Sequence, residues 1–276
     1  MFNLDYRTKF AIKVIILHAV ALIGVPLWFI YQQPGIGEVF FFIFLAMFVS
    51  RIANVGYHRW LAHHQFEPSW IGRKLMLWCM VLSAESPPGH YVATHLQHHA
   101  NTDEDGDPHG PKQIGLRRLF FGQYDTVTPK IGYLRFYSRQ KDAQFVTEHY
   151  WLLYLINWIV LGLISKWLII WMAFMFVFTW VWFIVINWNG HGGLKGEPTN
   201  LGWLSNIFMG GEDYHKNHHE KPGNLVYGKY DWTGQRFGFW LRARTNFEHR
   251  HHQCHVHVNF PFFLSGGALY SEKLAA

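Results

Sequence analysis

The sequence predicts an all-α integral membrane protein in which four transmembrane helices form two hairpins and the remaining segments form a helical cap. Two observations predict this fold class. Hydrophobic residues make up 50% of the chain and aromatic residues 18%, whereas charged residues make up only 15%, a composition too apolar for an ordinary soluble domain. In addition, four apolar stretches approach or reach the roughly 20 residues that a helix needs to cross a bilayer.

The four predicted spans fall into two pairs because the connection within each pair is very short. They cover residues 10–31, 36–57, 150–165 and 167–187. A Pro-Gly break in "QQPG" joins the first pair, and only Lys166 separates the second pair. The stretch 74–84 is too short to span and ends before Pro87, so we interpret it as an interfacial or re-entrant helix; a fifth span is the alternative.

Two hairpins return the chain twice to the side on which it starts. The segments 58–149 and 188–276 therefore share one face with the N-terminus and form the predicted cap of a single domain, residues 1–276. The loops on the opposite side carry one lysine, whereas the cap side carries nearly all other Lys and Arg residues. By the positive-inside rule, the cap and any site within it face the cytoplasm.

Charge and cysteine content limit the possible partners. The formal net charge is +6 and the pI is about 9.2, but the basic residues are scattered among apolar stretches. We therefore expect contacts with anionic membrane lipids or an acidic protein partner, and no binding of nucleic acid. Cys79 lies in an apolar stretch and Cys254 in a polar tail, which predicts reduced thiols without a disulfide or a thiolate zinc site.

Histidines recur at fixed spacings near the ends of the predicted spans. The pattern H-x-x-H-H occurs at residues 95–99 and again at 215–219, while "HRWLAHH" follows the second span and "NWNGH" ends the fourth. The candidate metal-binding residues are His58, His63, His95, His98, His99, Asn187, His191, His215, His218 and His219. Positions i, i+3 and i+4 share one helix face, so each H-x-x-H-H segment is expected to present its three imidazoles together. His58 and His63 are about 140° apart on a regular helix, so we expect them to address different metals or to straddle a helix end.

This set of donors predicts a metal centre. Neutral imidazole suits iron, copper, zinc and nickel, whereas calcium and magnesium prefer oxygen ligands. Nine imidazoles exceed the needs of one ion, so two metals with open positions fit better than one closed structural zinc, and iron is preferred because zinc has no redox chemistry. Six acidic residues near the histidines are candidates for orienting the rings: Asp103, Glu104, Asp105, Asp107, Glu212 and Asp213.

Four motifs in this order resemble those of membrane fatty acid desaturases of the stearoyl-CoA, or delta-9, type. They are "GYHRWLAHH", "THLQHHANTDEDGDPHGP", "NWNGH" and "GGEDYHKNHHEKPG", and the resemblance covers roughly residues 20–240. It implies a non-haem di-iron site held by the nine histidines above and by Asn187 acting through water. It assigns no catalytic residue beyond these. It also implies that dioxygen and two electrons remove two hydrogens from a saturated acyl chain.

The same resemblance implies the other partners. The substrate would be a fatty acyl chain carried on coenzyme A or on a lipid, held in an apolar tunnel and given a cis double bond, with delta-9 as the expected position. Electrons would come from a separate ferredoxin or cytochrome, because the chain carries no motif of either type. Departures from the family pattern, such as His64 and the pair Asp213-Tyr214, leave substrate preference and donor docking open.

Two alternative functions share the histidine content. A di-iron lipid hydroxylase or carotenoid ketolase would return oxygen to the substrate carbon; the H-x-x-x-x-H first box and the Asn187 and His191 element favour desaturation. A metal transporter would place its ligands near the bilayer midplane, whereas the paired boxes here lie outside the spans.

The remaining histidines are expected to serve other roles. His18, alone within the first span, is expected to be a packed polar residue. Four are expected at the surface or behind the ligands: His64, His90, His109 and His149. Five belong to a tail expected to be solvated: His249, His251, His252, His255 and His257.

Overall fold

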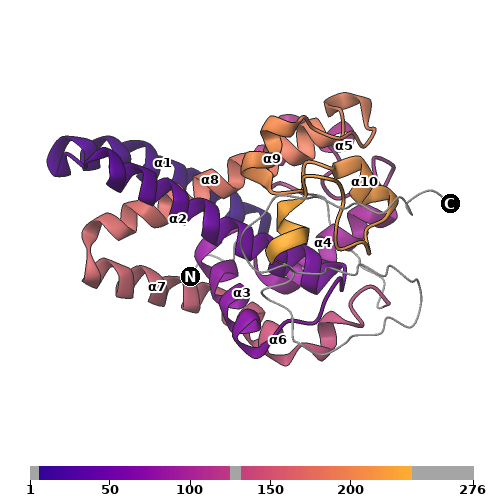
Figure 1. Ribbon diagram of the computed structural model, residues 1–276, viewed down its shortest axis with the longest axis horizontal. Helices are drawn as coiled ribbons and strands as arrows, with labels where there is room; N and C mark the ends of the chain where they lie inside the picture. The colour runs from indigo at the N-terminus through magenta and orange to yellow at the C-terminus, as the bar shows by residue number, and fades with distance from the viewer. Residues whose placement is uncertain (1–5, 125–131, 238–276) are drawn as a thin grey trace, which may run out of the picture. The chain divides into compact units, whose positions relative to one another are not determined.

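The computed structural model describes residues 6–124 and 132–237, and these residues are arranged as helices joined by loops (Figure 1). The α-helices are α1 (Tyr6–Gln32), α2 (Ile36–Asn54), α3 (Trp70–Ser83), α4 (Pro88–Ala100), α5 (Pro111–Phe120), α6 (Lys141–Glu148), α7 (Tyr150–Ile164), α8 (Lys166–Gly190), α9 (Trp203–Met209) and α10 (His215–Glu220). Shorter helical segments are the π-helices Val55–Ala62 and Thr233–Phe237 and the 3-10 turns Tyr137–Arg139 and Gly193–Lys195. The described residues all belong to one compact unit. The predicted histidine-rich tail, which contains His249 and the histidines after it, lies outside the described residues.

Within the described residues, three helices are long and apolar enough to cross a membrane. They are Arg7–Gln32, Ile36–Ala62 and Lys166–Gly190, which correspond to the predicted spans 10–31, 36–57 and 167–187. Helix α1 packs along α8, and α2 packs against both α8 and α3. In Figure 1, α1, α2, α7 and α8 run together away from the region where α3, α4, α5, α6, α9 and α10 gather. This division matches the predicted helical bundle with a helical cap.

The third predicted span, 150–165, is not confirmed as a span. Helix α7 has 15 residues, which at about 1.5 Å per residue reaches roughly 22 Å, short of the roughly 30 Å hydrocarbon core. Its length is fixed at both ends, because α6 precedes it after a break at His149 and the Ser165 hydroxyl caps the start of α8 by accepting a hydrogen bond from the Trp167 N–H. Helix α7 still packs against α8 as the second arm of a hairpin.

The predicted short helix 74–84 is the longer helix α3. Ser69 begins it as an N-cap whose hydroxyl accepts a hydrogen bond from the Gly72 N–H at 3.1 Å, and Ala84 ends it in the left-handed region at φ 54°. With 14 residues it is too short to be a candidate span. The Lys13 ammonium of α1 donates to the Glu85 carbonyl at 2.8 Å, which ties the end of α3 to the bundle.

The second long helix changes its pitch where it enters the cap. After Asn54 it continues as a π-helix, Val55–Ala62, and the His63 N–H donates to the His58 carbonyl five residues earlier at 3.0 Å. Gly56 makes room for this segment against α3, since a Cβ at that position would lie 2.9 Å from the Met76 Cβ and still closer to the end of the Met80 side chain. The tight packing of α3 against the π-helix therefore depends on a residue without a side chain.

We expect Gly56→Ala to destabilise the protein by about 1–3 kcal/mol, because the added methyl group overpacks the contact with Met76. The measurement is unfolding of the purified protein in detergent micelles. Gly37→Ala in α2 is the matched control, because no atom lies within 4 Å of the Cβ it would add. Its stability should stay within about 1 kcal/mol of the parent, and an equal effect of the two substitutions would contradict the packing argument.

Candidate metal centre

Nine histidines from four parts of the chain converge in the cap to form two clusters. The five-histidine cluster consists of His58, His63, His95, His99 and His218. The four-histidine cluster consists of His98, His191, His215 and His219. Within each cluster one nitrogen from every ring lies within 4.8 Å of all the others. The histidines that the sequence analysis singled out for metal binding are therefore brought together, although whether they bind metal stays a prediction.

The two H-x-x-H-H helices, α4 and α10, divide their histidines between the clusters. In α4, His95 and His99 join the five-histidine cluster, while His98 joins the four-histidine cluster. Helix α10 does the reverse: His215 and His219 join the four-histidine cluster, and His218 joins the five-histidine cluster. Each helix therefore presents its three imidazoles together, with ring centroids no more than 6.3 Å apart, but divides them between the two clusters. Positions i+3 and i+4 differ by about 100° around the helix axis, enough to aim their side chains at separate points.

The first box owes its geometry to the π-helix. His58 lies within it and His63 is the residue that ends it, and both belong to the five-histidine cluster, with ring centroids 4.8 Å apart. A π-helix has a wider turn than an α-helix, so residues five apart come onto one face. Both residues therefore lie in the same cluster, and the expected position at a helix end is confirmed, because His63 ends the π-helix.

The end of α8 supplies His191, whose ring lies between the two other parts of its cluster. Its Nε2 atom is 2.8 Å from that of His215, and its Nδ1 is 2.7 Å from Asp103 Oδ2. Asn187, one turn earlier on α8, is buried, and its amide NH2 donates to the Phe183 carbonyl at 2.8 Å. The side-chain oxygen is then its remaining polar group, which is the atom that the predicted water-mediated role requires.

Three of the six candidate acids face a histidine ring from outside the clusters. Asp107 Oδ2 lies 2.8 Å from His98 Nδ1, Asp103 Oδ2 lies 2.7 Å from His191 Nδ1, and Glu212 Oε2 lies 2.8 Å from His58 Nδ1. Of the others, Glu104 and Asp105 are exposed, and Asp213 accepts hydrogen bonds from the Asn206 amide and the Gly211 N–H. A carboxylate that accepts from Nδ1–H fixes the tautomer and leaves the Nε2 lone pair directed into the cluster.

The ionisation of the rings suits metal binding. Burial first, and the neighbouring histidines second, lower the pKa of His63, His95, His98, His99, His215, His218 and His219, that of His99 to about 3. These imidazoles are therefore neutral at pH 7, the form that ligates a metal.

The fit to two metal ions can be tested on the buried nitrogen atoms. Nε2 of His98 is buried without a hydrogen-bond partner among the described residues, while its Nδ1 is held by Asp107. In the five-histidine cluster, Nε2 atoms face one another at 2.8 Å between His63 and His95 and at 2.9 Å between His58 and His218. Converging lone pairs from neutral imidazoles need a shared electron acceptor, and transition-metal ions fill that role. The residues present therefore fit such ions.

A tenth histidine, His109, lies beside the four-histidine cluster. It is buried, and its ring stacks on that of His98 with centroids 4.4 Å apart. Its backbone N–H donates to Asp107 Oδ1 at 3.1 Å. Its expected place behind the ligands is consistent with this position, and its spacing two residues after Asp107 in "DPH" is the sequence signal for it. His18, as expected, is packed in the bundle, where its ring contacts Phe120 and Phe176.

A pocket adjoins the five-histidine cluster. It is lined by Phe10, Glu85, Ser86, His90, Tyr91, Thr94, His95, His109, Gly122, Tyr124, Trp180 and Phe183. Aromatic rings of α1 and α8 form its apolar side, and His95 connects it to the five-histidine cluster. Glu85 adds one acid to the wall, and burial raises the pKa of this carboxyl to about 7, against the opposing effect of Lys13 and Arg51. A mostly apolar pocket beside a histidine cluster suits an apolar substrate.

Comparison with known proteins points to one enzyme family. The family model described as fatty acid desaturase matches residues 34–228. The chain is 25% identical over 249 residues to Delta-9 acyl-lipid desaturase 2 of Arabidopsis thaliana, a match that covers 83% of this chain and 76% of the relative. It is 27% identical over 240 residues to sn-2 palmitoyl-lipid 9-desaturase of Nostoc sp. (strain 36), covering 79% of each. It is also similar, at 24% identity over 229 residues, to sn-1 stearoyl-lipid 9-desaturase of Synechocystis sp., covering 78% of this chain and 70% of the relative.

Asp107→Asn is expected to weaken metal binding at the four-histidine cluster by about 10–100-fold, because the amide no longer holds His98 in one tautomer. The measurement is titration of the metal-free protein with a divalent transition metal. Asp105→Asn is the matched control, since Asp105 lies in the same loop but is exposed. A normal affinity in Asp107→Asn would show that this carboxylate does not support the cluster.

Proposed function

The chain belongs to the fatty acid desaturase family, and we propose that it uses dioxygen to introduce a cis double bond, at the delta-9 position, into a saturated acyl chain. Members of this family are oxidoreductases. The single observation that supports the proposal most strongly is the pair of buried clusters that nine histidines form beside an apolar pocket. The reaction removes two hydrogen atoms from the substrate, that is, two protons and two electrons; with two more electrons from a donor and two protons from the solvent, one dioxygen is reduced to two water molecules.

Two iron ions are the proposed cofactors, one at each cluster. The nine clustered histidines would hold them, with Asn187 contributing through a water molecule beside His191. Bound iron supplies the activation of dioxygen, which is required because a methylene C–H bond has no acidic proton on which side chains could act. The protein residues supply the rest: Asp103, Asp107 and Glu212 orient imidazole rings, and burial keeps water from the donor atoms.

The proposed substrate is an acyl chain esterified to a membrane lipid. The names of the relatives above specify acyl-lipid or acyl groups on lipids, which supports a lipid carrier over coenzyme A for this chain. Phe10, Trp180 and Phe183 give the pocket an apolar wall that suits methylene groups. Holding the chain at a fixed depth beside His95 would select one pair of carbons.

The proposed topology has four spans, with the cap in the cytoplasm. Helix α7 is proposed as a span because it packs against α8 as the other arm of a hairpin. It is short, but local thinning of the bilayer accommodates a short apolar helix at modest cost. The turns at 33–35 and 165–166 carry only Lys166 as a basic residue, whereas the cap is rich in Lys and Arg. A separate cytoplasmic electron donor of ferredoxin or cytochrome type would then reach the cap.

Expression in a bacterium whose lipids contain saturated acyl chains should produce a new double bond, detected by mass spectrometry of derivatised fatty acids. His98→Ala should abolish the product and reduce the iron content, because His98 belongs to the four-histidine cluster. His149→Ala should leave both unchanged, since its ring packs on Phe145 away from the clusters. A hydroxy acid or keto product would instead support the hydroxylase or ketolase, and altered metal tolerance alone would support a transporter.

Single cysteines placed at Gln33 and at Lys166 should be labelled from the opposite side of the membrane to a cysteine at Lys216 on α10. The reason is that two hairpins put both turns on the side away from the cap. The measurement is labelling with a membrane-impermeant maleimide in intact and in opened cells, in a chain whose Cys79 and Cys254 are replaced by Ser. Labelling of positions 33 and 166 from opposite sides would rule out α7 as a span, and labelling of positions 166 and 216 from the same side would rule out α8.

A further inference from the structure

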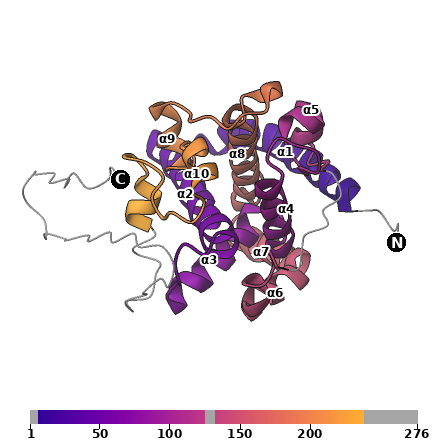
Figure 2. The ribbon, with the colours of Figure 1, turned by 90° about the vertical axis from the view of Figure 1, so that its right-hand side faces the viewer.

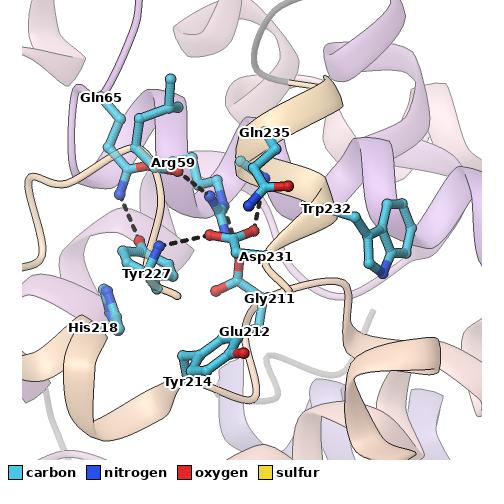
Figure 3. Close-up of polar contacts among 12 residues, drawn as sticks. Arg59, Gln65, Gly211, Glu212, Tyr214, His218, Tyr227, Asp231, Trp232 and Gln235 are labelled. Atoms are coloured by element: carbon cyan, nitrogen blue, oxygen red, sulfur yellow. Dashed lines mark hydrogen bonds and ion pairs between the residues drawn. The ribbon is translucent and has the colours of Figure 1, made fainter. Parts of the chain in front are cut away.

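A buried arginine joins the first histidine box to the segment that follows the last one. Arg59, the residue after His58 in the π-helix, is fully buried. Its Nε donates to Glu212 Oε1 at 2.8 Å, its Nη1 to the Leu225 carbonyl at 2.5 Å, and its Nη2 to both carboxylate oxygens of Asp231 at 3.1 Å (Figure 3). The guanidinium is therefore held on three sides. Every one of these partners is more than 150 residues away in the sequence.

Asp231 holds its own loop at the same time. It is fully buried, and besides the guanidinium it accepts hydrogen bonds from the Tyr227 N–H at 2.8 Å and the Gly234 N–H at 2.7 Å. The loop thus fixed places the Tyr227 ring over the Arg59 guanidinium at 4.4 Å and against the His218 ring, with centroids 4.8 Å apart. Figure 3 shows Asp231 between the guanidinium and the backbone of this loop.

Glu212 carries the contact onward from Arg59 to the histidines. One of its oxygens accepts from Arg59 Nε, and the other lies 2.8 Å from His58 Nδ1. An arginine stays protonated in a protein, so it offers Glu212 only donors and keeps the second oxygen available to the imidazole. The bridge therefore favours the His58 tautomer with its proton on Nδ1, whose Nε2 lone pair enters the five-histidine cluster 2.9 Å from His218 Nε2.

The two clusters are supported in different ways. Asp103 and Asp107, in the loop after α4, face His191 and His98 directly. The five-histidine cluster relies on Glu212, which is itself oriented by Arg59. The charges of this network also matter. A buried guanidinium alone would oppose the binding of a metal cation nearby, but Glu212 and Asp231 together with Arg59 give the network a net charge of −1.

We propose that Asp231 and Arg59 are positioning residues for the five-histidine cluster. Asp231 orients Arg59, Arg59 orients Glu212, and Glu212 sets the tautomer of His58, while the Asp231 loop presses Tyr227 against His218. None of the side-chain hydrogen bonds of Asp231 within the described residues reaches a histidine, so its effect is transmitted through Arg59 and through the loop. The assignment of metals to the clusters rests on the proposed function.

The test is Co²⁺ titration of the metal-free full-length protein in detergent micelles, followed by visible absorption. The parent should bind two Co²⁺ ions. Asp231→Asn should weaken one of them by about 10-fold and leave the other unchanged; this is the low end of the loss expected for a direct partner of a ligand, because Asp231 acts through Arg59 and Glu212. Asp107→Asn should weaken the other ion, so a variant with both substitutions should weaken both.

Controls separate positioning from general destabilisation. Asp213→Asn removes a neighbouring buried carboxylate that bonds Asn206 and Gly211, and it should leave both Co²⁺ affinities unchanged even if the metal-free protein melts at a lower temperature. Arg59→Lys keeps the buried charge but loses the planar fork, so it should reproduce the selective loss, and it provides a second test if Asp231→Asn does not fold.

Unchanged binding of both Co²⁺ ions by Asp231→Asn and Arg59→Lys would overturn the proposal, as would equal weakening of both ions or the same pattern in Asp213→Asn. Cobalt binding does not require turnover. If the parent binds two Co²⁺ ions but forms no double bond in lipids, desaturation is wrong, and these titrations still decide whether Asp231 positions the cluster.

Discussion

The structure depends on bringing nine imidazoles into two buried clusters whose nitrogen atoms converge. Burial and the neighbouring rings lower the pKa of seven of these histidines, and the Nδ1 atoms of His58, His98 and His191 each lie beside a carboxylate. Nitrogen atoms that converge in this way suit a transition-metal ion. The long helices serve this requirement by delivering His58 and His191 to the same region of the cap, shown facing the viewer in Figure 2.

Much of this arrangement could be predicted from local spacing. Three of the four spans follow from composition, and the histidines were identified because their boxes stand at helix ends. Spacing could not predict how the histidines of one motif are divided between the two clusters. Two helices that cross with identical H-x-x-H-H patterns can exchange their i+3 residues, as α4 and α10 do with His98 and His218, and that exchange depends on their mutual orientation. Sequence periodicity describes one helix at a time.

The remaining differences have physical causes that act across the fold. The π-helix that aligns His58 with His63 depends on packing against α3, which Gly56 permits. The helix propensities of residues 55–62 do not predict a π-helix. Helix α7 is short because Ser165, directly after it, caps the start of α8. Six acids were candidates for orienting rings, but only contacts such as that of Glu212 with His58, 154 positions away, distinguish the three that do so. Burial of Arg59 among carboxylates is equally beyond local patterns.

The apolar helices contribute both to the pocket and to the candidate metal centre. Phe10 of α1 and Trp180 and Phe183 of α8 line the pocket, and the same α8 ends in His191. A change in the position of α8 would therefore move the proposed acyl chain and a proposed iron ligand together, which keeps their separation constant. The pocket also touches His95 of one cluster and His109, which stacks on His98 of the other. An acyl chain held there, as proposed, would lie next to His95 and one ring away from His98.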